Sequence, residues 1–571
     1  MPKSKKTYAS LVTVILMVGI VIALNVIGNF FYETFDVTEE KRYTLTDNSR
    51  EFVEAMEDEL FVKVWLAGDL PAGFERMRER TEEILRELSQ INPNLSFEFR
   101  NPNDGDREAV NKLRQELAKD EMRPITLRIQ EQGETVDKII YPYVQIYRGK
   151  ENISINLLST EGAGFQSEET INEAIAMLEY NLVNGMRSLS SEDRPIVIFT
   201  RGHDELSRIQ TGDLINSMSN FYQVGQVYLD SVAYLSDEAD VLIVAKPRTA
   251  FSDKDKFKID QYLMRGGRVI WLLDKLGVTI DSLRSQTFFV PPELPLELND
   301  QLFTYGVRIR PNLVLDLECT KIPLQVGEQG GQPQFDLFDW YYHVAAAPAG
   351  DHITVRNLDR VNLLFPSAID TIKTATDIDK TVLLSSSEFS RLQFNPVRLN
   401  FEILRYDPDK SKFNQGPQNL AVLYEGEFSS HFKDRVTAQL KRGLEKMGVP
   451  FRESSKTTKM IVVSDGDVVR NLVDPRNQTA EPLGYNPYEQ YVFDNKNFIL
   501  NCIDYLIGDG SIVEARTKKL KLRLMNMPKV EQEKAYWQVF NLAGPLVLLF
   551  VFGGLYNYAR ARRFINNKKD M

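Results

Sequence analysis

Two long stretches of hydrophobic and uncharged residues lie near the ends of the chain. They cover residues 7–32 and 535–559, and neither contains a charged side chain. As helices that rise about 1.5 Å per residue, both exceed the roughly 30 Å hydrocarbon core of a bilayer. The pattern therefore predicts two transmembrane helices. The alternatives are a cleaved signal peptide for the first stretch, which lacks a small-x-small cleavage site, and a buried core helix for the second, which has no break.

Basic residues flank both stretches. Three lysines within residues 1–6 precede the first, and five basic residues within 560–571 follow the second. By the positive-inside rule, both termini are expected in the cytoplasm. Residues 33–534 would then form an ectodomain outside the cytoplasm, with 516–534 as a juxtamembrane segment.

Strand and helix patterns alternate in residues 33–190, the first part of this ectodomain. Residues 60–66 alternate between apolar and polar positions like a strand, 74–91 have helical spacing, and 95–99 resemble a second strand. This order predicts a small α/β domain, for which a thioredoxin-like fold is one candidate. The segment lacks a Cys-x-x-Cys motif, which excludes the redox chemistry of that fold.

The second part, residues 191–515, has the pattern of an open, mostly parallel sheet. Continuous apolar runs at 195–200, 241–245 and 268–273 are typical of strands buried on both faces. Helical spacing between the last two runs supports an alternation of strands and helices. Residues 283–418 interrupt this order with Pro- and Gly-rich segments, and we expect them to form a β-rich insertion.

The composition excludes several functional classes. The chain has 571 residues, with 69 Lys and Arg against 80 Asp and Glu, so its net charge is 69 − 80 = −11. A nucleic-acid-binding domain is usually basic, so that class is disfavoured. Two cysteines and four histidines exclude a disulfide scaffold and leave little for a zinc site. Cys319 and Cys502 could pair in an oxidising compartment, but their spacing does not decide this.

The most enzyme-like motif is Arg201-Gly202-His203-Asp204-Glu205, directly after the first core strand. Ligands of open α/β sheets bind at the carboxyl ends of the strands, so the position suits a binding site. A histidine beside two carboxylates can serve as an acid, a base or a metal ligand. Alternatively, Gly202 makes a turn, and Asp204 and Glu205 occupy the first turn of a helix. The sequence places no second His or Cys to complete a dyad.

A second motif, Asp465-Gly466-Asp467, follows another apolar strand. The two carboxylates could hold a cation, but a turn with glycine at its tight position explains the motif equally well. Phosphate-loop, serine-hydrolase, zinc-peptidase and dinucleotide-binding signatures are absent from the sequence. No catalytic, cofactor or metal site is therefore predicted. The candidate ligand or interaction site consists of His203, Asp204, Glu205, Asp465 and Asp467.

Five segments together carry a family resemblance. They are Asp36–Thr46, Gly202–Glu205, Leu263–Asp274, Val463–Asp467 and Asn497–Gly508. With them, the chain resembles the GldG family, gliding-motility-associated auxiliary components of ABC transporters in Bacteroidetes, over nearly its full length. The resemblance implies a bacterial inner-membrane protein with a periplasmic body, and a multi-span permease and a cytoplasmic ABC ATPase as partners. It also implies a role in gliding and its secretion machinery, and an amidotransferase-like central sheet without the catalytic cysteine.

The preferred hypothesis is a non-catalytic membrane subunit that passes ATPase-driven movement of the permease to a periplasmic protein partner. A membrane-anchored solute-binding protein, with its pocket near His203 or in the insertion, is the first alternative. An extracytoplasmic hydrolase that uses His203, Asp204 and Glu205 is the second.

Overall fold

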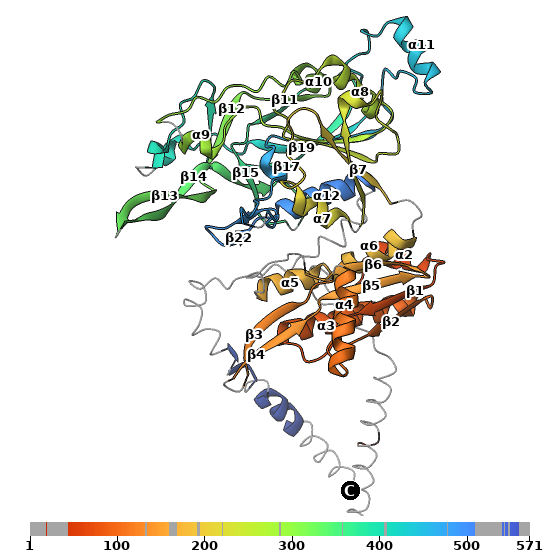
Figure 1. Cartoon of the computed structure of the whole chain (residues 1–571). Coiled ribbons are helices and arrows are strands. Elements are labelled where there is room, and N and C mark those ends of the chain that lie inside the picture. The colour runs from red at the N-terminus through yellow and green to blue at the C-terminus, as the bar shows by residue number, and fades with distance from the viewer. Residues whose placement is uncertain are drawn as a thin grey trace, which may run out of the picture. The chain divides into compact units, whose positions relative to one another are not determined.

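A computed structural model describes most of the chain between residues 44 and 508, together with helical residues near the carboxyl terminus (Figure 1). The described residues are 17, 19, 44–120, 122–131, 134–158, 168–190, 194–219, 221–284, 287–329, 331–356, 358–404, 408–476, 478–508, 540–541, 543–545 and 549–558. The chain divides into two compact units, residues 1–520 and 521–571. The larger unit contains both globular domains described next.

The amino-terminal domain is built on a four-stranded sheet in the order β2-β1-β5-β6. Its strands are β1 (Leu60–Val64), β2 (Leu95–Phe99), β5 (Tyr143–Arg148) and β6 (Glu151–Asn156). β1 and β2 are parallel and are connected through helix α3 (Ala72–Ile91), whereas β5 runs antiparallel to both β1 and β6. This mixed order is compatible with the thioredoxin-like fold considered from the sequence.

Alternate residues of these strands form the core of the small domain. Val62 and Val64 of β1 and Val144 and Ile146 of β5 are fully buried in one hydrophobic cluster. The helices that contribute to this cluster are α2 (Asp47–Glu54), α3, α5 (Glu168–Ala176) and α6 (Leu178–Ser190). The other elements of the domain are α4 (Arg107–Lys119) and the hairpin of β3 (Ile125–Glu131) with β4 (Glu134–Ile140). Period-two burial is what the alternating sequence pattern predicts.

The central domain contains a ten-stranded sheet in the order β13-β14-β17-β19-β20-β10-β9-β7-β8, with β15 paired to β14. The parallel strands are β8 (Gln223–Tyr228), β7 (Ile196–Arg201), β9 (Val241–Ala245), β10 (Arg268–Leu272) and β20 (Thr458–Val463). The antiparallel strands are β19 (Asn419–Gly426), β17 (Ile378–Ser385), β14 (Gln332–Pro348), β13 (Cys319–Gln329) and β15 (Val361–Leu364). The sheet is therefore mixed rather than mostly parallel, because strands from 283–418 extend it.

Helices cover both faces of the parallel part of this sheet. α7 (Gly212–Ser219) and α12 (Asn495–Ile507) pack in one hydrophobic cluster, and α8 (Asp253–Met264) and α10 (Asn299–Thr304) pack in another. Every residue of β9 between them is buried. Burial on both faces explains why the sequence shows continuous apolar runs here instead of alternation.

The remaining elements of the central domain are short. They are α9 (Ile280–Arg284), β11 (Val307–Ile309) paired with β16 (Ile369–Thr371), β12 (Asn312–Asp316) paired with β18 (Ser390–Phe394), α11 (Ala438–Lys446), and β21 (Tyr485–Asn486) paired with β22 (Tyr491–Val492).

The order of the parallel strands reverses between β7 and β9. β8 lies on one side of β7, and β9, β10 and β20 follow on the other side. In open α/β sheets, ligands bind outside the carboxyl ends of the strands at such a reversal. We name the row of residues that follows β7, β9, β10 and β20 the carboxyl edge. It is where this fold would be expected to hold a ligand.

The expected transmembrane helices are not supported by the structure. Among the described residues, no helix is both long enough and apolar enough to cross a membrane. A span needs about 20 helical residues, and the longest helical stretch described within 535–559 is 549–558. Most of the first predicted span, 7–32, lies outside the described residues, as do 1–6, 516–534 and 560–571. The predicted inner-membrane location with cytoplasmic termini is contradicted by the same finding.

A buried carboxylate in α12 ties that helix to tyrosines from two other elements. Asp504 is 1% exposed, and it accepts hydrogen bonds from the hydroxyl of Tyr222 and, at 3.3 Å, from that of Tyr180. Burial raises the pKa of Asp504 well above its ordinary value, although the charge of Arg187 opposes the shift. The folded protein therefore favours the protonated form of this side chain.

This raised pKa predicts a pH dependence of stability. The folded state binds a proton at Asp504 that the unfolded state releases above about pH 4, so stability falls as pH rises through the gap between the two pKa values. Asp504→Asn keeps the acceptor and cannot ionise. The free energy of unfolding of this variant, relative to that of the wild type, should therefore increase by about 1.4 kcal/mol for each unit of pH rise within that gap. Urea unfolding at several pH values measures this, and a constant difference would contradict it.

Candidate functional site at the carboxyl edge

Ionisable residues follow each strand of the carboxyl edge within four positions. They are His203 and Glu205 after β7, Lys246 after β9, Asp274 after β10, and Asp465 and Asp467 after β20. Because parallel strands point the same way, these residues gather along one side of the sheet. They form two clusters, one around His203 and one around Lys246.

His203 lies buried between two carboxylates and an aromatic ring. Its imidazole stacks on Phe251, with centroids 3.7 Å apart and an angle of 5° between the planes. Its Nδ1 lies 3.6 Å from Glu205 Oε1, and its Nε2 lies 3.6 Å from Asp255 Oδ2. Asp255 belongs to α8 and Phe251 precedes that helix. The imidazole therefore packs between the β7 loop and α8, and only 5% of the residue is exposed.

Glu205 is held as a carboxylate by its own loop. One carboxylate oxygen accepts a hydrogen bond from the hydroxyl of Thr200 at 3.0 Å, and the other accepts from the backbone N–H of His203 at 2.7 Å. Burial favours a raised pKa, but the hydrogen bonds from His203 and Thr200 outweigh it, so the pKa of Glu205 lies below its ordinary value. An acid of this kind is ionised near neutral pH and cannot donate a proton there.

Asp204 differs from its neighbours because it faces solvent. It is exposed, and its backbone lies in the left-handed region with φ 57°. Gly202, two residues earlier, has φ 113°. The motif therefore makes a turn at Gly202, as one of the two sequence interpretations has it. Asp204 and Glu205 do not begin a helix, since α7 starts only at Gly212.

The backbone of Asp204 predicts how this position tolerates substitution. A left-handed conformation costs a residue with a Cβ about 1–2 kcal/mol and costs glycine almost nothing. Asp204→Gly should therefore leave the free energy of unfolding unchanged or raise it by up to about 1 kcal/mol. Asp204→Val should lower it by about 1–2 kcal/mol, because β-branched residues avoid this region most strongly. Equal stabilities of the two variants in urea would show that the turn is not strained.

The second cluster centres on the buried amine of Lys246. Its Nζ lies 2.7 Å from Asp274 Oδ2 and also donates to Asp467. Arg470 adds a second cation, with its NH1 3.3 Å from Asp467 Oδ1. Only 2% of Lys246 is exposed. One lysine thus joins residues that follow three neighbouring strands, β9, β10 and β20.

Asp465 connects this cluster to the strands of the 283–418 segment. Its Oδ2 accepts from the backbone N–H of Leu364 in β15 at 2.7 Å, and its Oδ1 accepts from the N–H of Asp467 at 2.8 Å. His343 of β14 pairs with Leu364 across the ladder and is partly buried. Burial lowers the pKa of His343 to about 4, although the charge of Asp467 opposes the shift. Strands β14 and β15 therefore pack against the cluster.

The carboxylates of the cluster prefer different protonation states. Burial raises the pKa of Asp465 well above its ordinary value, and the charges of Asp467 and Asp274 add to the shift. Burial acts the same way on Asp467, but Lys246 and Arg470 outweigh it and lower the pKa of Asp467. Lys246 itself has a raised pKa, because the charges of Asp274 and Asp467 outweigh its desolvation. The cluster therefore balances its charges internally.

Gly466 is required by close packing rather than by a special backbone angle. Its φ is −82°, which any residue can adopt. A Cβ atom at this position would lie 2.5 Å from Lys246 Cβ and 2.8 Å from Lys246 Cα. Asp274 Oδ1 accepts from the N–H of Gly466 at 2.7 Å, which fixes the approach. The missing side chain of Gly466 therefore leaves room for Lys246, whose amine occupies the position that a cation would take between the carboxylates.

The two candidate motifs meet on one edge but do not form one constellation. The N–H of Arg248 donates to the carbonyl of His203 at 2.8 Å, and that of Leu206 donates to the carbonyl of Ala245 at 3.1 Å. These backbone bonds connect the β7 loop to the end of β9, beside Lys246. Among the residues that the structure describes, no group of three or more His, Cys, Asp or Glu side chains could hold a metal ion. Hydrogen bonds and ion pairs within the chain therefore connect the ends of neighbouring strands along this edge.

Sequence reasoning missed several members of the two clusters, among them Lys246, Asp274 and His343. Lys246 and Asp274 each follow an apolar strand directly or within two residues, and that placement was the available signal. His343 lies in a 17-residue strand and carries no comparable signal.

A family model described as an ABC-type uncharacterized transport system matches residues 194–502, more than half of the chain. The chain belongs to this family. A second model, the domain of unknown function DUF7088, matches residues 39–147, in the amino-terminal domain. Membership makes the chain an auxiliary component associated with an ABC transport system, and it favours a non-enzymatic role.

Other comparisons add little to the family assignment. A solved structure titled "mmIFT52 N-terminal domain" is 11% identical, with 55% of this chain and 97% of that chain covered, at a TM-score of 0.29. A score this low carries no argument about fold or function. No curated protein matches the chain.

Proposed function

We propose that the chain is a non-catalytic subunit that binds the permease and the ATPase of an ABC transport system and passes their movement to another protein. Family membership supports the association with such a system. The carboxyl edge is closed, in the sense that the ionisable side chains of its two clusters contact one another rather than solvent, and this supports a non-catalytic role. The finer assignment to the GldG family, with its link to gliding motility and secretion, rests on the five sequence segments that carry the resemblance.

The observation that carries this proposal is the state of the candidate residues. The side chains of His203, Glu205 and Asp467 are 7%, 1% and 11% exposed, and Asp465 is 1% exposed. The carboxylates of Glu205, Asp465 and Asp467 accept hydrogen bonds or form ion pairs within the chain, and the imidazole of His203 lies 3.6 Å from Glu205 and from Asp255, although its Nδ1 makes no hydrogen bond in the described part of the chain. A solute-binding protein or a hydrolase would need some of these groups to face its ligand. A subunit that works through protein contacts needs them only to hold the sheet edge together.

Co-purification tests the proposal directly. The tagged full chain is co-expressed with the permease and ATPase of its own system and, as a control, with those of an unrelated ABC system. We expect its own permease and ATPase at stoichiometric level and the unrelated pair at background. His203→Ala should co-purify as well as the wild type, because His203 supports the fold and not the partner contact. Recovery of the chain alone would overturn the proposal.

Solute binding is tested separately by thermal melting. A solute that binds the folded chain at a hundredfold excess over its Kd would add about 2.7 kcal/mol to stability. We expect no saturable rise in Tm across a panel of small anions, amino acids and sugars. A saturable rise that His203→Ala abolishes would favour the solute-binding alternative.

For the gliding assignment, deletion of the gene in a gliding source organism should abolish spreading, and the wild-type gene should restore it. Normal gliding in the deletion strain would refute that part of the proposal alone.

A further inference from the structure

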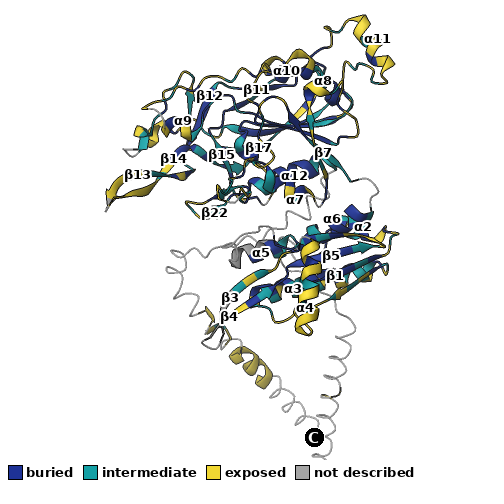
Figure 2. Ribbon diagram, viewed as in Figure 1, coloured by how far each residue is buried: buried dark blue, intermediate teal, exposed yellow. Residues whose placement is uncertain are grey.

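A basic arm leaves the otherwise acidic chain between β19 and β20. Residues 430–456, here named the arm, contain seven Lys and Arg and three Asp and Glu, a net charge of 7 − 3 = +4. The chain as a whole carries −11, so the remainder carries −11 − 4 = −15. Helix α11 lies in this arm and is exposed along most of its length (Figure 2). The arm is therefore opposite in charge to the rest of the protein.

The arm is an ordered element with a fixed root. Asp260 of α8 accepts from the hydroxyl of Ser430 at 2.7 Å and from the N–H of His431 at 2.8 Å. Phe432 packs edge-on against Phe257 of the same helix, with centroids 5.2 Å apart. These contacts anchor the start of the arm on α8 while α11 remains exposed.

Helix α11 is amphipathic. Leu440, Leu444 and Met447 recur at helical spacing and form one apolar stripe. Leu444 is buried, but Leu440 and Met447 are 46% and 49% exposed. Exposed Arg442 and Lys446 lie on the opposite side of the helix. The helix thus presents an apolar stripe and a basic side, and the described part of the chain leaves much of both uncovered.

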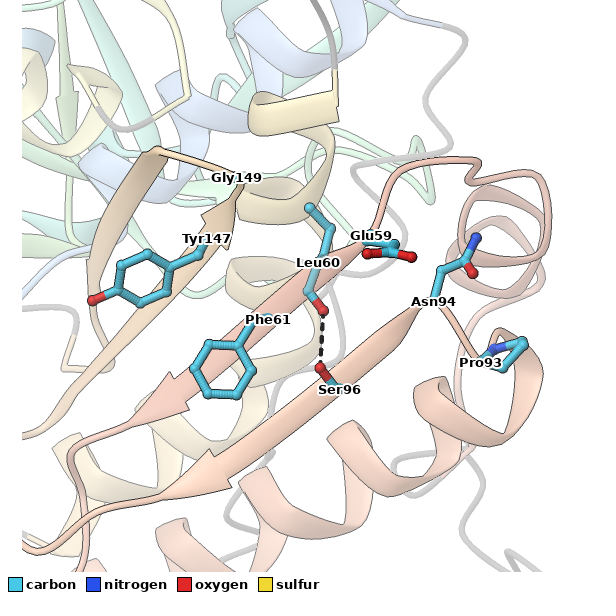
Figure 3. A pocket seen from close by; sticks show the side chains of 8 residues that line it. All are labelled: Glu59, Leu60, Phe61, Pro93, Asn94, Ser96, Tyr147 and Gly149. Carbon is cyan, nitrogen blue, oxygen red and sulfur yellow. Dashed lines mark hydrogen bonds between the residues drawn. The ribbon is translucent and has the colours of Figure 1, made fainter.

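The amino-terminal domain carries a pocket with the complementary chemistry (Figure 3). It has a volume of about 430 Å³, and its lining combines the polar side chains of Glu59, Asn94 and Ser96 with the rings of Phe61 and Tyr147. Phe61 and Tyr147 lie side by side, with ring centroids 6.1 Å apart. The pocket therefore has an aromatic wall that suits aliphatic side chains.

Acidic residues surround one end of this pocket. Glu57, Asp58 and Glu59 are consecutive, and Glu57 and Glu59 are exposed. Asp58 is paired with Arg148 at 3.4 Å, but no ion pair is seen for Glu57 or Glu59 within the described chain. Two carboxylates beside a pocket with one aromatic wall match two cations beside an apolar stripe.

We infer that α11 of one copy of this chain docks into the pocket of a second copy. Leu440 and Met447 would cover Phe61 and Tyr147, while Arg442 and Lys446 reach toward the acidic rim. Two copies that exchange arms would close a dimer, because the same two patches then meet twice. A helix of nine residues is about 14 Å long, so each contact is small and the association weak and salt-sensitive. This contact is independent of the proposed transport partners.

Sedimentation velocity of the full chain tests the inference over a range of protein concentrations. We expect dimers at low ionic strength and monomers at high ionic strength, since screening shortens from about 10 Å at 0.1 M to about 3 Å at 1 M salt. A chain that stays monomeric at every concentration in low salt would overturn the inference.

A charge swap identifies the surfaces. Arg442→Glu with Lys446→Glu should weaken dimerisation roughly tenfold or more, and Glu57→Lys with Glu59→Lys should do the same. Mixing the two variants should restore association, because the arm of each variant is opposite in charge to the pocket rim of the other. The matched control, Lys373→Glu with Lys410→Glu, makes the same charge change at exposed lysines elsewhere and should dimerise like the wild type. Equal loss in the control, or no recovery in the mixture, would contradict the docking pair.

Leu440→Ser with Met447→Ser tests the apolar half of the contact. Both residues are half exposed, so the fold should tolerate the change. We expect dimerisation to be lost at all salt concentrations, with an unchanged melting temperature of the monomer. Retained dimers would show that the stripe is not part of the interface.

Discussion

Lys246→Met should lower the free energy of unfolding by about 3–5 kcal/mol, the largest loss expected from any single change in the carboxyl edge. The reason is that the buried amine of Lys246 is bonded to both Asp274 and Asp467, whose side chains are only 14% and 11% exposed. Methionine retains most of the volume of the side chain but removes the positive charge. Two largely buried carboxylates would then lack their closest cation. Urea unfolding of the variant and the wild type measures the difference.

The pH dependence of Lys246→Met has a defined sign. In the wild type, Lys246 and Arg470 lower the pKa of Asp467, so that carboxylate stabilises the fold at neutral pH and the stabilisation is lost as pH falls. Without the lysine, Asp467 should bind a proton more readily when folded. The cost of the substitution should therefore shrink as the pH is lowered from about 7 toward 4.

Two control variants separate this electrostatic cost from loss of packing. Lys373→Met removes an exposed lysine and should change stability by no more than about 0.5 kcal/mol. Lys246→Met combined with Asp467→Asn should be less destabilised than the sum of the single variants, because the two side chains interact. A cost below about 1 kcal/mol for Lys246→Met, or strict additivity in the double variant, would show that the ion pairs do not hold this edge.

Gly466→Ala is expected to produce the second large loss, about 3 kcal/mol or somewhat more. The added methyl group would lie within 3 Å of three atoms of Lys246, including its backbone Cα. Backbone atoms of Lys246 cannot move away easily, since its N–H donates to the carbonyl of Leu272 at 2.9 Å. The variant must therefore separate the ends of β9 and β20.

The matched control for Gly466→Ala is Gly443→Ala in α11. Gly443 lies in a helix, and nothing lies within 4 Å of a Cβ built there. Alanine should stabilise that helix by up to about 1 kcal/mol. Thermal or urea unfolding of both variants tests the pair of expectations. If Gly466→Ala were as stable as the wild type, close packing of Lys246 against Gly466 would be disproved.

Strand positions in the central sheet could be read from the sequence because the strands are buried on both faces. The predicted runs 195–200, 241–245 and 268–273 agree with β7, β9 and β10 to within a residue at each end. The antiparallel half could not be read in this way. Seven of the 17 residues of β14 are exposed, and its pairing with β17 depends on contacts between segments that are distant in the sequence.

The location of the candidate site could be predicted from the sequence, but the side chains that interact there could not. A parallel sheet directs attention to residues after each strand, and His203, Glu205, Asp465 and Asp467 lie there. Lys246 and Asp467 are 221 positions apart, so no local pattern reveals that the amine fills the gap between the aspartates. Gly466 was interpreted as a turn glycine, but its φ is ordinary and only the approach of Lys246 explains it.

The charge-free runs at 7–32 and 535–559 show that hydropathy alone does not suffice to predict membrane-spanning helices in this chain. Hydropathy reports that a segment could enter a bilayer, but a span also requires an unbroken helix of about 20 residues. No such apolar helix occurs among the described residues. The prediction of two transmembrane helices was therefore wrong by this criterion.

The central structural claim is that the carboxyl edge is closed by the chain itself, and the reactivity of Lys246 tests it most directly. The native full chain is treated with an amine-acylating reagent, and modification of each lysine is followed by mass spectrometry. We predict that Lys246 reacts at least about a hundredfold more slowly than the exposed Lys254 and Lys373, and at the same rate after denaturation. Rapid modification of Lys246 in the native chain would show that the edge is open to ligands, and would contradict the non-catalytic, closed-edge account.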